Sequence, residues 1–202
     1  MRRVTEPDLP TVVPGALTLS CDPLDARPLF WTEPDGTRHG YEPDAAAVVA
    51  ERLGLSLRWR FVDWNDRYGA VERREADGVW CGIAVTPERA AAMRLTSPYA
   101  VFDEALCVRD DSPIRSVADV AGRRIGAIAG STNLALAATW PGAVLVPFDG
   151  EGDDVFGQMQ RAVRDGAVVG FVDDEPAFLD IGDGLRVAFS CATRQRWACA
   201  LR

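Results

Sequence analysis

The chain has 202 residues and a mass of 21.9 kDa, a size that fits one large domain or two compact lobes. Hydrophobic residues make up 48% of the sequence and charged residues 26%, and these values exclude a collagen, a coiled coil and a long disordered tail. The 22 Lys and Arg residues against 30 Asp and Glu residues give a net charge of -8, which argues against nucleic acid as a partner.

The first 14 residues carry charges where a signal peptide has an apolar centre, and no apolar run approaches the ~20 residues of a membrane span. Two interpretations stay open: a cytoplasmic protein, or a chain whose leader has been removed. The five cysteines form no C-x-x-C pair, and the single His39 lies in a turn-like stretch. We therefore expect no metal site, no cofactor, and no Ser-His or Cys-His nucleophile.

The first part of the chain alternates between strand and helix patterns. The predicted strands are 16–21, 55–62 and 78–81, and the predicted helices are 43–53 and 65–75. The first helix is alanine-rich and stops at Gly54. The order β-α-β-α-β predicts a parallel sheet covered by helices.

A helix over 87–93 follows, and then an extended apolar run over 99–108 that is long enough to leave one sheet and enter another. Beyond it, strands are predicted over 124–128, 143–147, 168–172, 185–189 and 197–201, and helical segments over 116–120, 131–139, 153–164 and 175–179. We predict two α/β lobes hinged by two extended strands. Residues 15–102 and 188–202 form the first lobe, 103–187 form the second, and 1–14 are flexible.

Ligands of open parallel sheets bind beyond the carboxyl ends of the strands. Four places in this chain qualify: Asp22, the segment 82–89, the turn 130–132, and the pair Asp173 and Asp174. In the second of them, Thr86 is a natural helix N-cap, and a cation such as Arg89 in the first helical turn opposes the helix dipole. Arg89 therefore indicates an anion-binding site, or else an ion pair with Glu88 or a neighbouring surface acid.

The remaining candidates each have a structural alternative. Ser131 and Thr132 offer an anion-accepting turn, but Ser131 could simply cap the helix. Of the two adjacent carboxylates, one could face the ligand while the other caps. Trp64 could form a wall against a ligand or pack beneath the helix that follows it.

The sequence resembles family 3 extracellular solute-binding proteins, the amino-acid receptors of ABC importers, from about Gly15 to its end. The matching segments are Gly40-Tyr41-Glu42-Pro43-Asp44, Ala50-Glu51-Arg52-Leu53-Gly54, Ala76 to Arg89, Ser97-Pro98-Tyr99, Asp111-Ser112-Pro113-Ile114, Ala129-Gly130-Ser131-Thr132 and Trp197 to Arg202. Their number and order make the resemblance far more specific than any one segment.

This resemblance implies a two-lobed α/β fold, of the type II periplasmic-binding-protein class, that closes on a small ligand. It implies that Arg89 and Thr132, with Ser131 beside it, bind the ligand carboxylate. The α-ammonium group would fall to Asp174, with Asp173 next to it, and to the carbonyl of Gly82. The resemblance also places Asp22 at the ligand and Trp64 against its side chain.

The function implied is capture of an amino acid or similar zwitterion, and its delivery by a monomeric, extracytoplasmic receptor to an ABC permease. No enzymatic activity is expected. Two alternatives stay open: a dehydratase-like enzyme of the same fold, in which Asp173, Asp174 or Asp22 supplies a general acid, and the sensing domain of a signalling receptor. The chain stops at Leu201 and Arg202, where relatives usually continue, so we expect a C-terminal helix to be missing.

Overall fold

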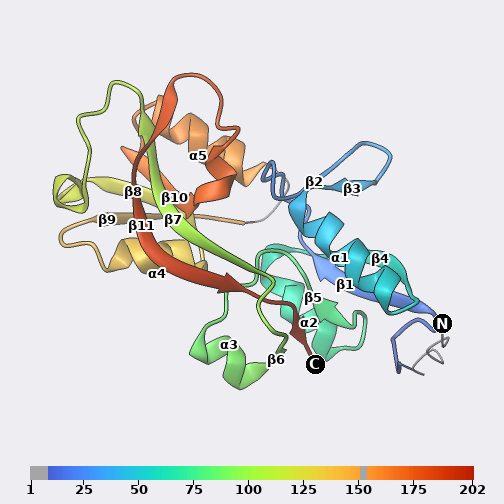
Figure 1. Cartoon of the computed structure of the whole chain (residues 1–202). Helices are drawn as coiled ribbons and strands as arrows, with labels where there is room; N and C mark the ends of the chain where they lie inside the picture. Colours follow the sequence, from blue (N-terminus) through green and yellow to red (C-terminus); the bar gives the residue numbers. More distant parts are fainter. Residues whose placement is uncertain (1–8, 151–153) are drawn as a thin grey trace. The chain divides into compact units, whose positions relative to one another are not determined.

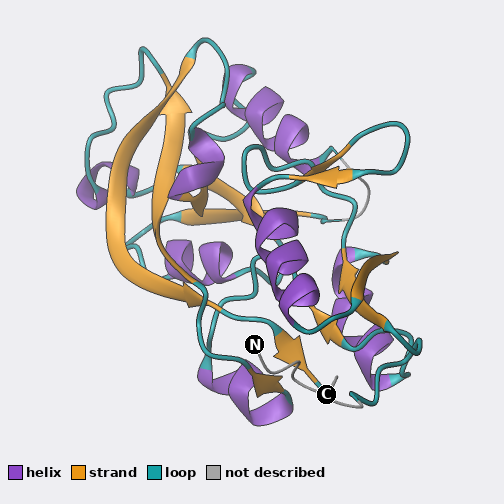
Figure 2. Ribbon diagram, turned by 45° about the vertical axis from the view of Figure 1, so that its right-hand side comes forward, coloured by secondary structure: helices purple, strands orange, loops and turns teal. Residues whose placement is uncertain are grey.

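A computed structural model describes residues 9–150 and 154–202. The chain divides into two compact units, each with its own α/β sheet (Figures 1 and 2). The first unit contains the described residues up to Pro23, residues 30–99 and residues 197–202, and the second contains residues 24–29 and 100–196. In the two described segments, no helix combines the length and the apolar character needed to cross a membrane.

The sheet of the first unit has five strands in the order β4-β1-β5-β12-β6. Their bounds are Ser56–Phe61, Ala16–Cys21, Gly78–Val79, Ala200–Leu201 and Arg94–Leu95, in that order. The predicted parallel arrangement is present where β1 pairs with β4 and with β5, whereas β12 is antiparallel to both of its neighbours. A small antiparallel hairpin joins β2 (Trp31–Thr32) to β3 (Arg38–His39).

Helix α1 (Tyr41–Arg52) begins two residues earlier than its alanine-rich pattern predicts. Its acidic residues lie in the first turn and Arg52 in the last, as the helix dipole favours. The helix ends as predicted, because Gly54 takes a φ of 72°, a conformation that glycine adopts at little cost. The amide of Leu55 then bonds back to the carbonyl of Ala50 at 3.0 Å.

The second predicted helix is shorter than expected. It consists of a 3-10 turn η1 (Trp64–Asp66) and helix α2 (Arg67–Glu72), and it ends because Arg74 takes a φ of 61°. Helix α3 (Pro87–Ala92) starts as predicted, with the Thr86 side chain accepting a bond from the Arg89 amide at 3.2 Å.

The sheet of the second unit has the order β11-β7-β10-β8-β9. The bounds are Leu185–Trp197, Ala100–Arg109, Gly170–Asp174, Arg124–Ile128 and Val144–Phe148, in that order. Strand β8 is parallel to β9 and β10, while β10 is antiparallel to β7. The long strands β7 and β11 run side by side in both views (Figures 1 and 2).

Helices α4 (Thr132–Ala138) and α5 (Val155–Arg164) are drawn on opposite sides of strands β8 and β10 (Figure 1). Ala137 of α4 packs in a core cluster with Ile125 and Val172. Helix α5 buries Val155, Met159 and Val163, which recur every four residues along one face. Two 3-10 turns, η2 (Val117–Val120) and η3 (Glu175–Phe178), take the place of short predicted helices.

Two strand predictions in the second unit are wrong in register or extent. Strand β10 begins two residues later than the apolar run 168–172, because the Val168 and Val169 amides bond to Ala162 and Arg124 before the pairing with β7 starts. The expected strand 185–189 extends to Trp197 as β11, which continues through the polar segment 190–196. Of the expected strand 197–201, only 200–201 form a separate strand, β12, in the sheet of the first unit. A ladder with a neighbouring strand can hold polar residues extended without any apolar alternation.

The boundaries of the two units also differ from the predicted lobes. Residues 24–29, 100–102 and 188–196, expected in the first lobe, belong to the second unit. Of the stretch 1–14, for which we expected flexibility, residues 1–8 lie outside the described residues. Within the remainder, the Val12 amide donates to Asp77 at 2.7 Å.

Candidate functional site

Asp22 and Trp64, both predicted to contact a ligand, meet the same side chain in the first unit. Asp22 follows β1 and is fully buried, and its carboxylate lies 3.4 Å from Nη1 of Arg67. The Arg67 guanidinium carbon lies 3.4 Å from the centroid of the Trp64 ring, which is a stacked cation–π contact. Arg67 is 4% exposed. The structure therefore brings Asp22 and Trp64 together around an internal guanidinium.

Gly82 lies in the loop between β5 and α3. Its φ of 63° is in the left-handed region, and a Cβ built there would lie 3.2 Å from the Trp197 ring. The Gly82 amide donates to Oε2 of Glu42 at 2.7 Å. On the far side of the loop, the amide of Ala198 bonds to the carbonyl of Ile83 at 2.9 Å. The loop is thus held from α1 on one side and from the end of β11 on the other.

Glu42 is a buried carboxyl group with two donors on one oxygen. Besides the Gly82 amide, Oε2 accepts the Tyr99 hydroxyl at 2.8 Å. Burial raises the pKa of Glu42 to about 7, and the two hydrogen bonds and the charge of Arg38 only partly oppose this rise. Glu42 consequently changes its charge near neutral pH.

Arg89 occupies the first turn of α3 with its side chain half-buried. Its Nη1 donates to the Ala84 carbonyl at 3.0 Å. Among the described residues, Arg89 forms no ion pair with Glu88 or any other acid, so the surface-pair alternative is not what the structure shows. The Arg89 guanidinium is therefore anchored by one hydrogen bond, while no acid among the described residues neutralises its positive charge.

In the second unit, the turn 130–132 precedes α4. Ser131 is the N-cap of this helix, since its hydroxyl accepts the Leu134 amide at 3.0 Å. The capping alternative for Ser131 is therefore confirmed. Thr132 is the first helical residue and is half-buried. Asn133, which follows it, is 5% exposed.

Asp173 and Asp174 lie inside β10 and not beyond it, because the ladder with β7 pairs them with Ala105 and Glu104. Oδ1 of Asp173 accepts the Asp174 amide at 2.8 Å. Burial raises the pKa of Asp173 to about 7, and the charge of Glu104 adds to the rise, while the Asp174 amide and the Asn133 side chain oppose it. Asn133, in the first turn of α4, thus connects that helix with Asp173 of β10.

Glu104 adds a third carboxyl group to this part of the second unit. It is 2% exposed, and its Oε1 accepts a hydrogen bond from the side-chain amide (Nε2) of Gln195 at 3.1 Å. Burial is the main cause that raises its pKa, against hydrogen bonds from Thr193 and Gln195. Asp173, Asp174 and Glu104 thus place three carboxyl groups on two adjacent strands.

Sequence reasoning missed Arg67, Glu42, Glu104 and Asn133 as contributors to these two groups of residues. Arg67 and Glu104 fall within a predicted helix and a predicted strand, where nothing local singles them out. Glu42 lies in one of the family motifs, which does not by itself mark it as a site residue. A charged residue in the middle of an apolar strand, such as Glu104 in YAVFDEALCV, was the one usable signal.

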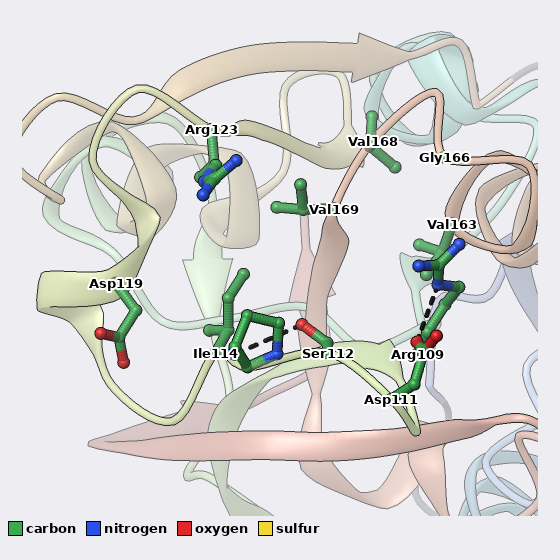
Figure 3. A pocket seen from close by; sticks show the side chains of 11 residues that line it. Arg109, Asp111, Ser112, Ile114, Asp119, Arg123, Val163, Gly166, Val168 and Val169 are labelled. Carbon is green, nitrogen blue, oxygen red and sulfur yellow. Dashed lines mark hydrogen bonds and ion pairs between the residues drawn. The ribbon is translucent and has the colours of Figure 1, made fainter.

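A separate surface pocket of about 410 Å³ lies in the second unit (Figure 3). Arg109 and Asp111, paired at 3.0 Å, stand on one side of it, and Arg123 and Asp119 on the other. None of the sequence-predicted site residues lines this pocket. Within the described part of the chain, no group of three His, Cys, Asp or Glu residues could hold a metal ion.

Residues 22–187 match a family described as bacterial extracellular solute-binding proteins, family 3. This match extends over more than half of the chain. The chain belongs to this family. The resemblance inferred from the ordered motifs is confirmed.

A probable amino-acid ABC transporter-binding protein of Haemophilus influenzae is a relative of this family 3 member, 24% identical over 168 residues. The alignment covers 80% of this chain and 63% of the relative. The chain spans 40% to 63% of the length of the first curated relatives that it matches.

Solved structures share the fold. An ancestral arginine-binding protein bound to arginine has a TM-score of 0.80 at 22% identity, covering 93% of this chain and 84% of that one. The ancestral amino acid-binding protein AncCDT-1, a precursor of cyclohexadienyl dehydratase, has a TM-score of 0.81 at 22% identity, covering 93% and 82%. At this identity the likeness concerns the fold alone, and it confirms the predicted two-lobed α/β class.

Proposed function

We propose that this family 3 protein captures an amino acid and delivers it, as a monomeric extracytoplasmic receptor, to the permease of an ABC importer. The observation that carries the proposal is the half-buried Arg89, a guanidinium anchored by a backbone carbonyl and unmatched by any acid among the described residues. A planar fork of this kind is suited to a carboxylate. The family match and the amino-acid-binding relatives support the same function.

The two ends of a zwitterion correspond to two sets of residues in this chain. We assign the carboxylate to Arg89, with Thr132 and Ser131, and the α-ammonium group to Asp174 and to the carbonyl of Gly82. Asp174, which β10 places opposite Glu104 of β7, supplies the carboxylate that an ammonium group requires. Asp173, buried beside Asp174, supports the neighbouring backbone amide.

The second part of the proposal is that the protein binds its ligand without converting it. The neighbour AncCDT-1 is a precursor of a dehydratase, so the fold itself does not exclude an enzyme. Family membership and the binding-protein relatives support a receptor. Recovery of a bound amino acid unchanged after prolonged incubation, measured by NMR, is the expected result, and a new product in the spectrum would contradict it.

A thermal unfolding screen tests the function directly. A true ligand at a hundred times its dissociation constant stabilises the chain by ~2.7 kcal/mol, whereas its deaminated analogue, which lacks the ammonium group, gives a smaller shift. Calorimetry then confirms one site per chain. If none of the amino acids shifts the unfolding temperature, the proposed function is wrong.

A further inference from the structure

The first unit contains a complete recognition site for a guanidinium group, and the occupant comes from the same chain. Trp64 supplies a ring face at 3.4 Å from the Arg67 guanidinium carbon, and Asp22 supplies a carboxylate at 3.4 Å from Nη1. The backbone of Arg67 is also held, because its carbonyl accepts the Ser20 hydroxyl at 2.9 Å. A planar cation stacked on an aromatic ring and paired with a carboxylate is well satisfied.

Apart from the Asp22 carboxylate, which already pairs with Arg67, two buried polar atoms at Arg67 and Tyr68 can each donate a hydrogen bond. Nε of Arg67 and the Tyr68 hydroxyl are buried, and neither has a hydrogen-bond partner among the described residues. Arg67 and Arg89 both lower the pKa of Tyr68, against the larger effect of burial, so Tyr68 lies within electrostatic reach of both guanidinium groups. This region of the first unit therefore favours an acceptor oxygen over a further cation.

The balance of buried charges in the first unit also disfavours a further cation. Among the described residues, the buried guanidinium groups of this unit are those of Arg38 and Arg67. The buried acids of this unit are Asp22 and Glu42, and Glu42 carries only part of a charge near pH 7 because burial raises its pKa. A positive excess in a low-dielectric region repels cations.

We propose that Arg67 is an internal occupant of the subsite formed by Asp22 and Trp64, and that it restricts the ligand to amino acids whose side chains carry no positive charge. This inference rests on the proposed function and adds the ligand class to it. A basic side chain could enter the subsite only by displacing Arg67. That displacement would leave a buried guanidinium without its carboxylate, which is strongly unfavourable.

Several structural neighbours are arginine-binding proteins, so their names would suggest a basic ligand. Their identity to this chain is 22% or less, so their ligand does not carry over. Specificity in such sites is a difference of affinities, and a cation already in place is a direct means of exclusion.

Calorimetry with L-arginine and L-citrulline provides the first test, because citrulline has the same length but an uncharged urea group. The wild-type chain should bind citrulline at least about tenfold more tightly than arginine. Arg67→Ala should raise the affinity for arginine at least about tenfold by vacating the subsite. Wild-type binding of arginine as tight as that of citrulline, or tighter, would overturn the inference.

A second test does not depend on the amino-acid site. Methylguanidinium should raise the unfolding temperature of Arg67→Ala, and tetramethylammonium at the same concentration should not. The matched control is Arg60→Ala, which removes an exposed arginine paired with Glu75 and should show no specific response. Equal responses of both variants to methylguanidinium would contradict an internal guanidinium site.

The two tests separate the inference from the function on which it rests. If the wild-type chain binds no amino acid, the proposed function fails, and the methylguanidinium response still decides whether Asp22 and Trp64 form a guanidinium site. If Arg67→Ala does not fold, the arginine and citrulline affinities of the wild-type chain decide the ligand class.

Discussion

Arg89 is the residue on which the carboxylate end of the proposed ligand depends. Its fork has one bond, to the Ala84 carbonyl, and no acidic partner among the described residues. Arg89→Ala should therefore lose ~2–5 kcal/mol of binding free energy, and Arg89→Lys should recover little of it, because an ammonium group cannot form the bidentate contact. Calorimetry measures both, with the exposed Arg94→Ala as the control. Wild-type affinity in Arg89→Ala would refute the assignment.

Asp174 and Asp173 allow a paired prediction for the ammonium end. Asp174→Asn should weaken binding of an amino acid by several kcal/mol, because a desolvated cation would face a neutral amide, and it should affect the deaminated analogue much less. Asp173→Asn should alter stability more than affinity, since Asp173 is buried and bonds the neighbouring amide. Calorimetric titration of both variants with the amino acid and with its deaminated analogue measures these effects. The reverse pattern would exchange the roles of the two residues.

The loop between β5 and α3 is an element held by contacts distant in sequence. Glu42 of α1 bonds the Gly82 amide, and Trp197 covers the position where a Gly82 side chain would lie. Its conformation is therefore set by α1 and by the end of β11 together. Arg89 follows this loop directly, so the loop controls where the guanidinium is presented.

Gly82→Ala tests how strictly this loop is constrained. The left-handed φ alone should cost ~1–2 kcal/mol of unfolding free energy, and the contact at 3.2 Å with the Trp197 ring should add to that loss and weaken ligand binding. Gly36→Ala is the matched control, because Gly36 has a φ of 85° with nothing within 4 Å. Urea denaturation of both variants gives the comparison. Equal losses would show that the Trp197 contact is not restrictive.

For the molecule as a whole, each unit contains one buried carboxyl group with a pKa of about 7: Glu42 in the first and Asp173 in the second. Their ordinary values are 4.5 and 3.8, so the folded chain binds more protons than the unfolded chain between about pH 4 and 7. The stability that protonation contributes is complete below pH 4 and is lost as the pH rises through 7.

The expected result is an unfolding free energy that falls between pH 5 and 7, with a slope of up to ~1.4 kcal/mol per pH unit for each group, and that levels off above about pH 8. Glu42→Gln and Asp173→Asn should each flatten the slope, whereas Glu51→Gln, on the exposed face of α1, should leave it unchanged. Denaturation curves across this range provide the measurement. A stability that rises from pH 5 to 7 would contradict the buried-carboxyl account.

Short-range sequence patterns were sufficient to predict several elements. The alternating run at β1 and the strand β8 were predicted to the residue, and the Ser131 cap was foreseen as an alternative. These features depend on residues within a few positions of one another, where side-chain period and capping chemistry act. The ordered family motifs are of the same kind, and they were sufficient to predict the family and its two-lobed fold.

Other features depend on residues far apart in the chain, and these only the tertiary structure decided. The register of β10 follows from its ladder with β7, so Asp173 and Asp174 lie within the strand and opposite Ala105 and Glu104. The pairing of Arg67 with Asp22 spans 45 positions, and that of Glu42 with Gly82 spans 40. Sequence alone marks a charge as present, but its partner, its burial and therefore its pKa are set by where the folded backbone carries it.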